Sequence, residues 1–162
     1  MADATFKRID EMKATFRGSM RKVRAELGLA SFGVQTIDLP PDSTRHPCDD
    51  HAEDGQEEMY IAPEGRGALE LEAVERFPLE RDCVIRAGPG ERRRVLAGPD
   101  GIRMLIVAGI PGLPYEPWHR TELGAPDPMA RLTRDSWHAG RTRGKMAPRD
   151  PLGPRRRPAP QP

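Results

Sequence analysis

The residues most able to do chemistry lie between Asp49 and Gly67, in the segment DDHAEDGQEEMYIAPEGRG. Asp49 and His51 form an Asp-x-His pair, and Glu58 follows an acidic loop at the start of an apolar run. Two carboxylates and one imidazole can bind Fe(II), Mn(II) or Zn(II) and leave coordination positions open for a substrate. The segment therefore predicts a metal or ligand site.

The pattern around this segment predicts short strands separated by turns. Strands are favoured by the runs SFGVQTIDLP, EMYIA, GALELEA, ERFPL, DCVIRAG, RRRVLAG and GIRMLIVAGI. Turns are favoured by EGRG, GPGE and GPDG. Many short strands at regular spacing, without helices between them, indicate a sandwich or a barrel. Side chains alternate along a strand, so Asp49 and His51 share one face, as do Glu58 and Tyr60.

The two ends of the chain differ from this middle. Residues 6–28 carry apolar residues at helical spacing and predict one or two short helical pieces, the second capped by Ser19 and ended by Gly28. Residues 113–130 are punctuated by proline, and we expect them to wrap the surface. Residues 131–162 are basic, rich in proline and glycine and poor in apolar side chains, so we expect a disordered tail.

The composition argues against several classes of protein. The net charge of +1 combines an acidic middle with a basic end, and we do not expect a nucleic-acid-binding protein. The N-terminus carries charges where a signal peptide needs an apolar core, and no run is long enough to span a membrane. Two cysteines are too few for a disulfide scaffold, so we expect a cytoplasmic protein with reduced thiols. By the two-residue period of a strand, the side chains of His46 and Cys48 face away from that of Asp49, so we expect both on the protein surface.

These motifs resemble those of the cupin superfamily, and in particular the short single-domain bacterial cupins of the RmlC-like kind. The sequence DDH (49–51) stands at the His-x-His of the first cupin motif, and Glu58 stands at its Glu, with six residues between it and Gly65. The sequence GPGERR (88–93) falls on the centre of the second motif. The resemblance covers roughly residues 19–130.

The resemblance implies an all-β fold, a double-stranded β-helix or jelly-roll barrel with a short N-terminal helical extension and a disordered C-terminal tail. The expected parts are a helical extension over 1–30, a cupin barrel over 31–112, a surface-wrapping segment over 113–130 and a disordered basic tail over 131–162. It also implies a homodimer, because a partner often covers the open edges of such barrels.

Several positions depart from the family pattern, among them two of the four ligand positions. Asp49 stands where the first His belongs, and Arg93 stands where the His of the second motif belongs. A guanidinium cannot donate an electron pair to a metal, so Arg93 would repel a cation and compete for the carboxylates. If the family geometry holds, these side chains converge inside the barrel. The candidate ligand-binding residues are Asp49, His51, Glu58, Tyr60 and Arg93.

Two functions stay open at this point. In the first, which we favour, the barrel binds a small polar or anionic ligand and has no tightly bound metal or other cofactor. In the second, His51, Glu58 and Asp49 hold Fe, Mn or Zn in a metal-dependent enzyme of the dioxygenase or isomerase type. Its substrate would be a small acid or a sugar-like molecule. The sequence identifies no catalytic residue, and the position of Arg93 distinguishes the two functions.

Overall fold

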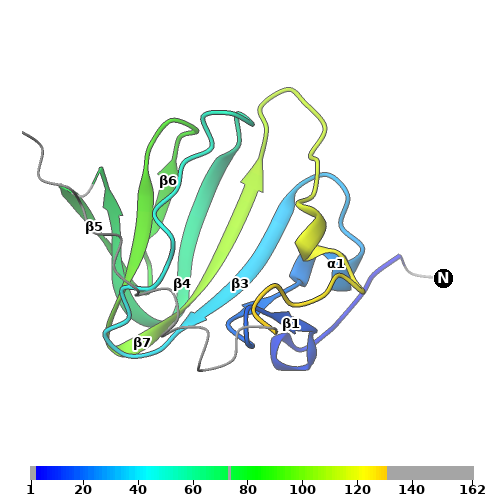
Figure 1. The fold of residues 1–162 in the computed structure, drawn as a ribbon, viewed down its shortest axis with the longest axis horizontal. Coiled ribbons are helices and arrows are strands. Elements are labelled where there is room, and N and C mark those ends of the chain that lie inside the picture. Colours follow the sequence, from blue (N-terminus) through cyan, green and yellow to red (C-terminus); the bar gives the residue numbers. More distant parts are fainter. Residues whose placement is uncertain (1–2, 73, 131–162) are drawn as a thin grey trace, which may run out of the picture. The chain divides into compact units, whose positions relative to one another are not determined.

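The computed structural model describes residues 3–72 and 74–130, and almost all of their regular structure is β-sheet. Seven strands form a single sheet in the order β1-β2-β3-β7-β4-β5, with β6 paired to β4 (Figure 1). In chain order the elements are η1 (Ile9–Glu11), β1 (Ala14–Thr15), β2 (Met20–Arg21), α1 (Val23–Leu27), β3 (Gly33–Leu39), β4 (Glu57–Leu71), β5 (Glu75–Leu79), β6 (Val84–Ala87), β7 (Arg93–Gly109) and η2 (His119–Thr121). All paired strands are antiparallel.

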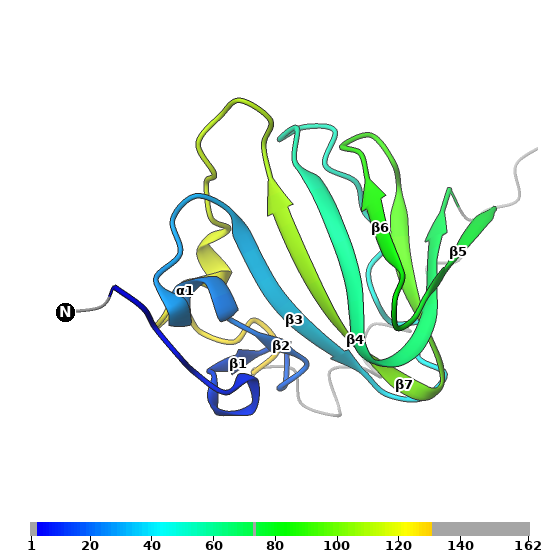
Figure 2. The ribbon, with the colours of Figure 1, turned by 180° about the vertical axis from the view of Figure 1, so that it is seen from behind.

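The long strands β4 and β7 bend and so take part in both halves of the barrel (Figures 1 and 2). The first half of β4 pairs with β6 and the second half with β5, while β7 runs beside β4 along both halves. The β4–β7 register shifts between Ile61 and Glu64 and again between Gly65 and Gly67. The predicted strands are therefore present, but the turns predicted at EGRG and GPDG are wrong, because each is a bend within one continuous strand.

The two bends lie against each other and require glycine. Gly65 and Gly101 have φ angles of 72° and 76°, in the left-handed region. A Cβ atom at Gly65 would lie 2.2 Å from the carbonyl oxygen of Gly101, and one at Gly67 would lie 2.2 Å from that of Leu96. The glycines that resemble turn signals in the sequence therefore allow two backbones to cross.

The hydrophobic core lies between the two halves of the barrel. Its buried members are Tyr60, Ala62, Leu69, Leu79, Ala87, Val95, Ile102, Met104 and Ile106. Along the first half of β4, alternate residues face the core, as the period of a strand requires. Glu58 and Tyr60 therefore share the interior face, as predicted.

The N-terminal segment forms a small hairpin where a helical piece was predicted. Strands β1 and β2 extend the sheet beyond β3, and the chain turns between them through Phe16 and Arg17, both with positive φ. The backbone N–H groups of these two residues donate to the carboxylate of Asp127 at 2.9 and 2.8 Å. The helix predicted before this turn is wrong, because these hydrogen bonds to Asp127, which is far along the chain, stabilise the turn instead. Helix α1 does end at Gly28, but Ser19 does not cap it and donates to the Phe16 carbonyl instead.

The segment after β7 runs beside α1 (Figures 1 and 2). The buried Nζ of Lys22 donates to the carbonyl oxygens of Glu122 and Ala125 at 2.8 and 3.0 Å, and Arg24 forms an ion pair with Glu122.

No helix in the described part of the chain is long and apolar enough to cross a membrane. The tail predicted over residues 131–162 lies outside the described residues.

Candidate functional site

The carboxylate of Glu58 is placed by a row of paired residues on the inner face of the sheet. Glu58 on β4 pairs with Ala87 on β6 and with Ala108 on β7, and Ala108 pairs in turn with Gly33 on β3. Residues directly opposite each other on antiparallel strands point to the same face. Since the neighbours of Glu58 in this row are all small, the ring of Tyr115 can lie over Gly33, where its hydroxyl oxygen is 2.5 Å from the position that a Cβ atom would take.

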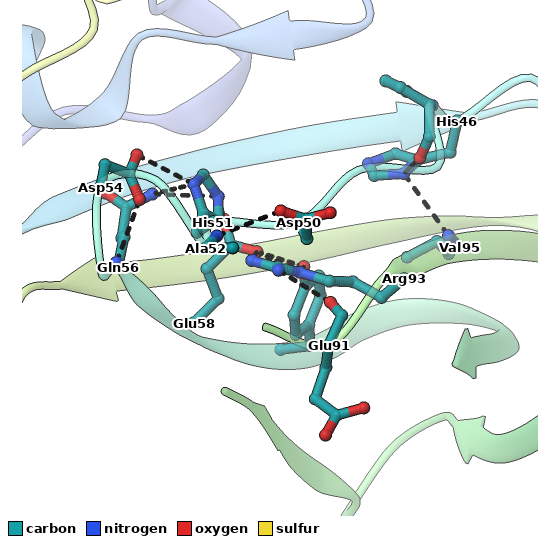
Figure 3. Close-up of polar contacts among 12 residues, drawn as sticks. His46, Asp50, His51, Ala52, Asp54, Gln56, Glu58, Glu91, Arg93 and Val95 are labelled. Atoms are coloured by element: carbon teal, nitrogen blue, oxygen red, sulfur yellow. Dashed lines mark hydrogen bonds and ion pairs between the residues drawn. The ribbon is translucent and has the colours of Figure 1, made fainter. Parts of the chain in front are cut away.

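The side chain of Arg93, fully buried at the start of β7, reaches the carboxylate of Glu58 (Figure 3). Its Nη2 and Nε donate to Oε2 of Glu58 at 2.7 and 3.2 Å, and its Nη1 donates to the carbonyl oxygen of Glu91 at 3.0 Å. The hydroxyl of Tyr60 donates to the same Oε2 and accepts from Nε of Arg93 at 3.3 Å. Oε2 of Glu58 therefore accepts three hydrogen bonds, two from Arg93 and one from Tyr60.

The other oxygen of Glu58 faces His51 in the loop before β4. Nε2 of His51 lies 3.4 Å from Oε1 of Glu58, and Nδ1 lies 3.0 Å from Oδ2 of Asp54. The side-chain amide nitrogen of Gln56 is 3.1 Å from Nε2. The backbone N–H of His51 donates to the carbonyl oxygen of Pro89 at 2.7 Å, which ties this loop to the turn before β7. The imidazole thus bridges the interior carboxylate of Glu58 and the loop carboxylate of Asp54.

The electrostatics of the cluster keep Glu58 ionised. Burial on its own would raise the pKa of Glu58, but hydrogen bonds from His51, Tyr60 and Arg93 lower it to about 2. The bond to Glu58 also raises the pKa of His51. Burial and the neighbouring carboxylate raise the pKa of Tyr60, so its hydroxyl remains a hydrogen-bond donor at neutral pH.

Asp49 lies at the edge of the cluster, and its side chain does not join it. Its backbone N–H and carbonyl pair with those of Arg93 at 3.2 and 2.9 Å, so the two residues are opposite each other in a β-bridge. The residue is exposed, and its carboxylate forms no hydrogen bond or ion pair with the described residues. The expectation that Asp49 converges with Glu58 inside the barrel is corrected: the residue is exposed, and its carboxylate acts on Glu58, Arg93 and His51 through its charge alone.

The side chains of the cluster do not fit a metal ion. No group of three or more His, Cys, Asp and Glu residues within 3–72 and 74–130 could hold one. Oε2 of Glu58 is occupied by Arg93 and Tyr60, and a buried guanidinium beside the donors would repel a cation. Asp49, His51 and Glu58 therefore do not form the ligand set that the resemblance implies.

Two polar side chains near the cluster were not predicted from the sequence. The Nδ1 atom of His46 lies 3.4 Å from the backbone nitrogen of Val95, and burial lowers the pKa of this imidazole (Figure 3). The prediction that His46 lies on the surface is wrong, because strand parity does not hold in a loop, whereas Cys48 is exposed as predicted. Gln56, beside His51, carries no signal in the sequence that distinguishes it from an ordinary loop residue.

Comparison with solved structures identifies the architecture. A cupin protein from Bacteroides fragilis is similar, with a TM-score of 0.56, 20% sequence identity and coverage of 75% of this chain and 95% of that one. The fold is that of the cupins. An RmlC-like cupin protein from Desulfovibrio desulfuricans matches a smaller part, with a TM-score of 0.44, 18% identity and coverage of 49% and 72%. No protein-family model matches the sequence, and no curated protein matches it either.

The all-β jelly-roll fold predicted from the motifs is therefore confirmed. At 20% identity the likeness extends to the fold and not to a reaction, because cupin-like barrels, as other common folds, carry many functions. A function has to be argued from the side chains around Glu58.

Proposed function

We propose that the cupin barrel binds a small polar ligand at its mouth without a tightly bound metal. The proposal is supported by the unequal surroundings of the two oxygens of Glu58. Oε2 is occupied by Arg93 and Tyr60, whereas Oε1 faces His51. The side chains of His51 and Glu58 are 22% and 10% exposed, but that of Arg93 is fully buried. An entering ligand therefore meets an imidazole and a carboxylate oxygen rather than the guanidinium.

The charges at the mouth favour a neutral ligand over an anion. Arg93 neutralises Glu58 and lies out of a ligand's reach. The loop before β4 adds four exposed carboxylates, those of Asp49, Asp50, Glu53 and Asp54. These groups repel an anion, whereas hydroxyl or amide groups can donate to Oε1 of Glu58 and contact His51. Of the polar and anionic ligands considered from the sequence, we therefore propose the polar class, such as a polyol or a sugar.

A further polar side chain faces the interior from β3. Gln35 pairs with Ile106 on β7, and Ile106 pairs with Tyr60 on β4, so the three share the inner face in the row next to Glu58. Gln35 is half-buried, and its amide forms no hydrogen bond with any described residue. It offers a ligand one acceptor and two donor hydrogens within the barrel.

The test is a thermal-shift screen of the full chain against sugars, polyols and small organic acids, with and without Fe(II), Mn(II) and Zn(II). We expect stabilisation by a neutral polar compound in the absence of metal, and loss of that stabilisation in His51→Ala and Gln35→Ala. Metal content after dialysis is measured by mass spectrometry. Stoichiometric metal that is retained by the protein and lost in His51→Ala would overturn the proposal.

A further inference from the structure

A groove of about 600 Å³ lies beside the barrel mouth, between the loop before β4 and the segment after β7. These two loops stand side by side at the same end of the sheet (Figures 1 and 2). The loop before β4 contributes Asp54 and Gln56, the residues that also contact His51 on the other side. A volume of this size is within the usual range for sites that bind small molecules.

The other wall of the groove is apolar and carries an aromatic ring that stacks on a second one. Ile110, Leu113 and Trp118 line it, and Leu113 and Trp118 are 66% and 47% exposed. Phe16 stacks on Trp118, with ring centroids 5.8 Å apart and planes at 25°. Since the backbone of Phe16 is held by Asp127, the indole is supported from behind by the N-terminal hairpin. The groove thus presents a supported aromatic surface to solvent.

The charge of the groove is negative. Glu116 lines it and forms no hydrogen bond or ion pair with the described residues. Asp54 uses its oxygens to accept from the backbone of Gln56 and to contact His51, but its charge remains at the rim. The guanidinium carbon of Arg120 lies 5.4 Å from the ring centroid of Trp118. The indole of Trp118 therefore already attracts a cation of the chain itself.

We propose that this groove binds a small organic cation, with an ammonium or quaternary ammonium group against Trp118 and Glu116. An indole ring attracts cations through its quadrupole, and the carboxylates of Glu116 and Asp54 supply the opposite charge. The apolar side chains of Ile110 and Leu113 suit the alkyl groups that such a cation carries. An anion is disfavoured by the same two carboxylates. The groove and the interior of the barrel are separate sites that share one loop.

The experiment uses the full chain with Trp137→Phe, so that Trp118 is the remaining tryptophan of the two in the sequence. Its fluorescence is followed during titration with choline and, separately, with 3,3-dimethylbutan-1-ol, which has the same shape without the charge. We expect a saturable change with choline and none with the alcohol. Glu116→Gln should weaken binding about fivefold, since an exposed ion pair is worth up to about 1 kcal/mol. The matched control Glu75→Gln, on β5, should leave it unchanged.

Two further variants distinguish this site from others. Arg120→Ala should tighten choline binding, because the guanidinium competes for the same ring. Gln35→Ala should leave choline binding unchanged, although it impairs the proposed polar site in the barrel. An equal response to choline and to the alcohol would overturn the proposal, as would unchanged affinity in Glu116→Gln. Loss of choline binding in Gln35→Ala would place the cation in the barrel instead and would also overturn it.

Discussion

At the scale of single residues, the site depends on the ion pair between Arg93 and Glu58. Both groups are buried, and a buried charge is tolerated only with a partner and hydrogen bonds. The guanidinium supplies the positive charge that the buried carboxylate requires. Tyr60 completes the arrangement by donating to the same carboxylate oxygen.

Removing Arg93 should therefore destabilise the fold more than removing both members of the pair. Arg93→Met leaves a buried carboxylate without its cation, which typically costs about 3–5 kcal/mol of unfolding free energy. Glu58→Gln combined with Arg93→Met removes both charges, so the double variant should be more stable than Arg93→Met alone. Urea denaturation at pH 7 measures both values. An unfolding free energy of Arg93→Met within about 1 kcal/mol of the wild-type value would contradict the role given to this pair.

The contact between Arg93 and Glu58 could be predicted from the sequence, but its surroundings could not. Two motifs place a guanidinium near carboxylates, and a guanidinium pairs with a carboxylate through strong hydrogen bonds. The predicted positions of Asp49 and His46 depend on side-chain directions in a loop, where the two-residue period of a strand does not apply. Strand parity predicts Asp49 inside the barrel and His46 on the surface, whereas the structure has Asp49 exposed and His46 half-buried.

At the scale of elements, the strands were predictable and their continuity was not. Alternating apolar residues mark each half of β4 and of β7, but glycine pairs between the halves resemble hairpin turns. Whether a glycine ends a strand or bends it depends on the backbone that passes beside it. Here the bends of β4 and β7 cross each other, which a single sequence does not show.

Substitution at this crossing should be costly. In Gly65→Ala the new Cβ would meet the carbonyl oxygen of Gly101, and the residue would keep a positive φ angle. Steric overlap and backbone strain together should lower the unfolding free energy by about 2–4 kcal/mol. Gly90→Ala is the matched control, because its Cβ meets no atom within 4 Å. Equal melting temperatures for the two variants would rule out a close crossing at Gly65.

At the scale of the whole molecule, the cluster should make the unfolding free energy fall both at acid pH and at alkaline pH. The pKa of Glu58 is lowered to about 2 by His51, Tyr60 and Arg93, so its contribution is present above the unfolded-state value of 4.5 and is lost as the pH falls towards 2. The corresponding loss of unfolding free energy is on the order of 3 kcal/mol. The pKa of His51 is raised, so its contribution is present below 6.5 and is lost as the pH rises through the folded-state pKa.

Urea denaturation from pH 3 to pH 9 should therefore show a maximum between these two regions. Glu58→Gln should flatten the acid side of the profile relative to the wild type, and His51→Gln should flatten the alkaline side. An alkaline limb that is the same in the wild type and in His51→Gln would contradict the assignment to this imidazole. Other acids with lowered pKa values, such as Glu70 between Arg76 and Arg94, remain in both variants and so cancel in the comparison.

The stability of a truncated chain should depend on whether it keeps residues 113–130. A chain that ends after Ala130 retains Asp127, Glu122 and Ala125, which hold the N-terminal hairpin and Lys22. It lacks only the basic segment, whose composition does not favour a packed core. We expect it to melt at the temperature of the full chain.

A chain that ends at residue 112 should behave differently. It removes both carbonyl acceptors of the buried Lys22 ammonium and the carboxylate that holds the turn at Phe16. Hydrogen bonds to a charged group are worth about 1.5–3 kcal/mol each, so the loss of two of them should lower the unfolding free energy by at least about 3 kcal/mol. Lys22→Met in the shorter chain should recover part of this loss, because it removes the unpaired charge. Calorimetry of the three chains measures the effect, and equal melting of the two truncated chains would show that the segment after β7 does not stabilise the barrel.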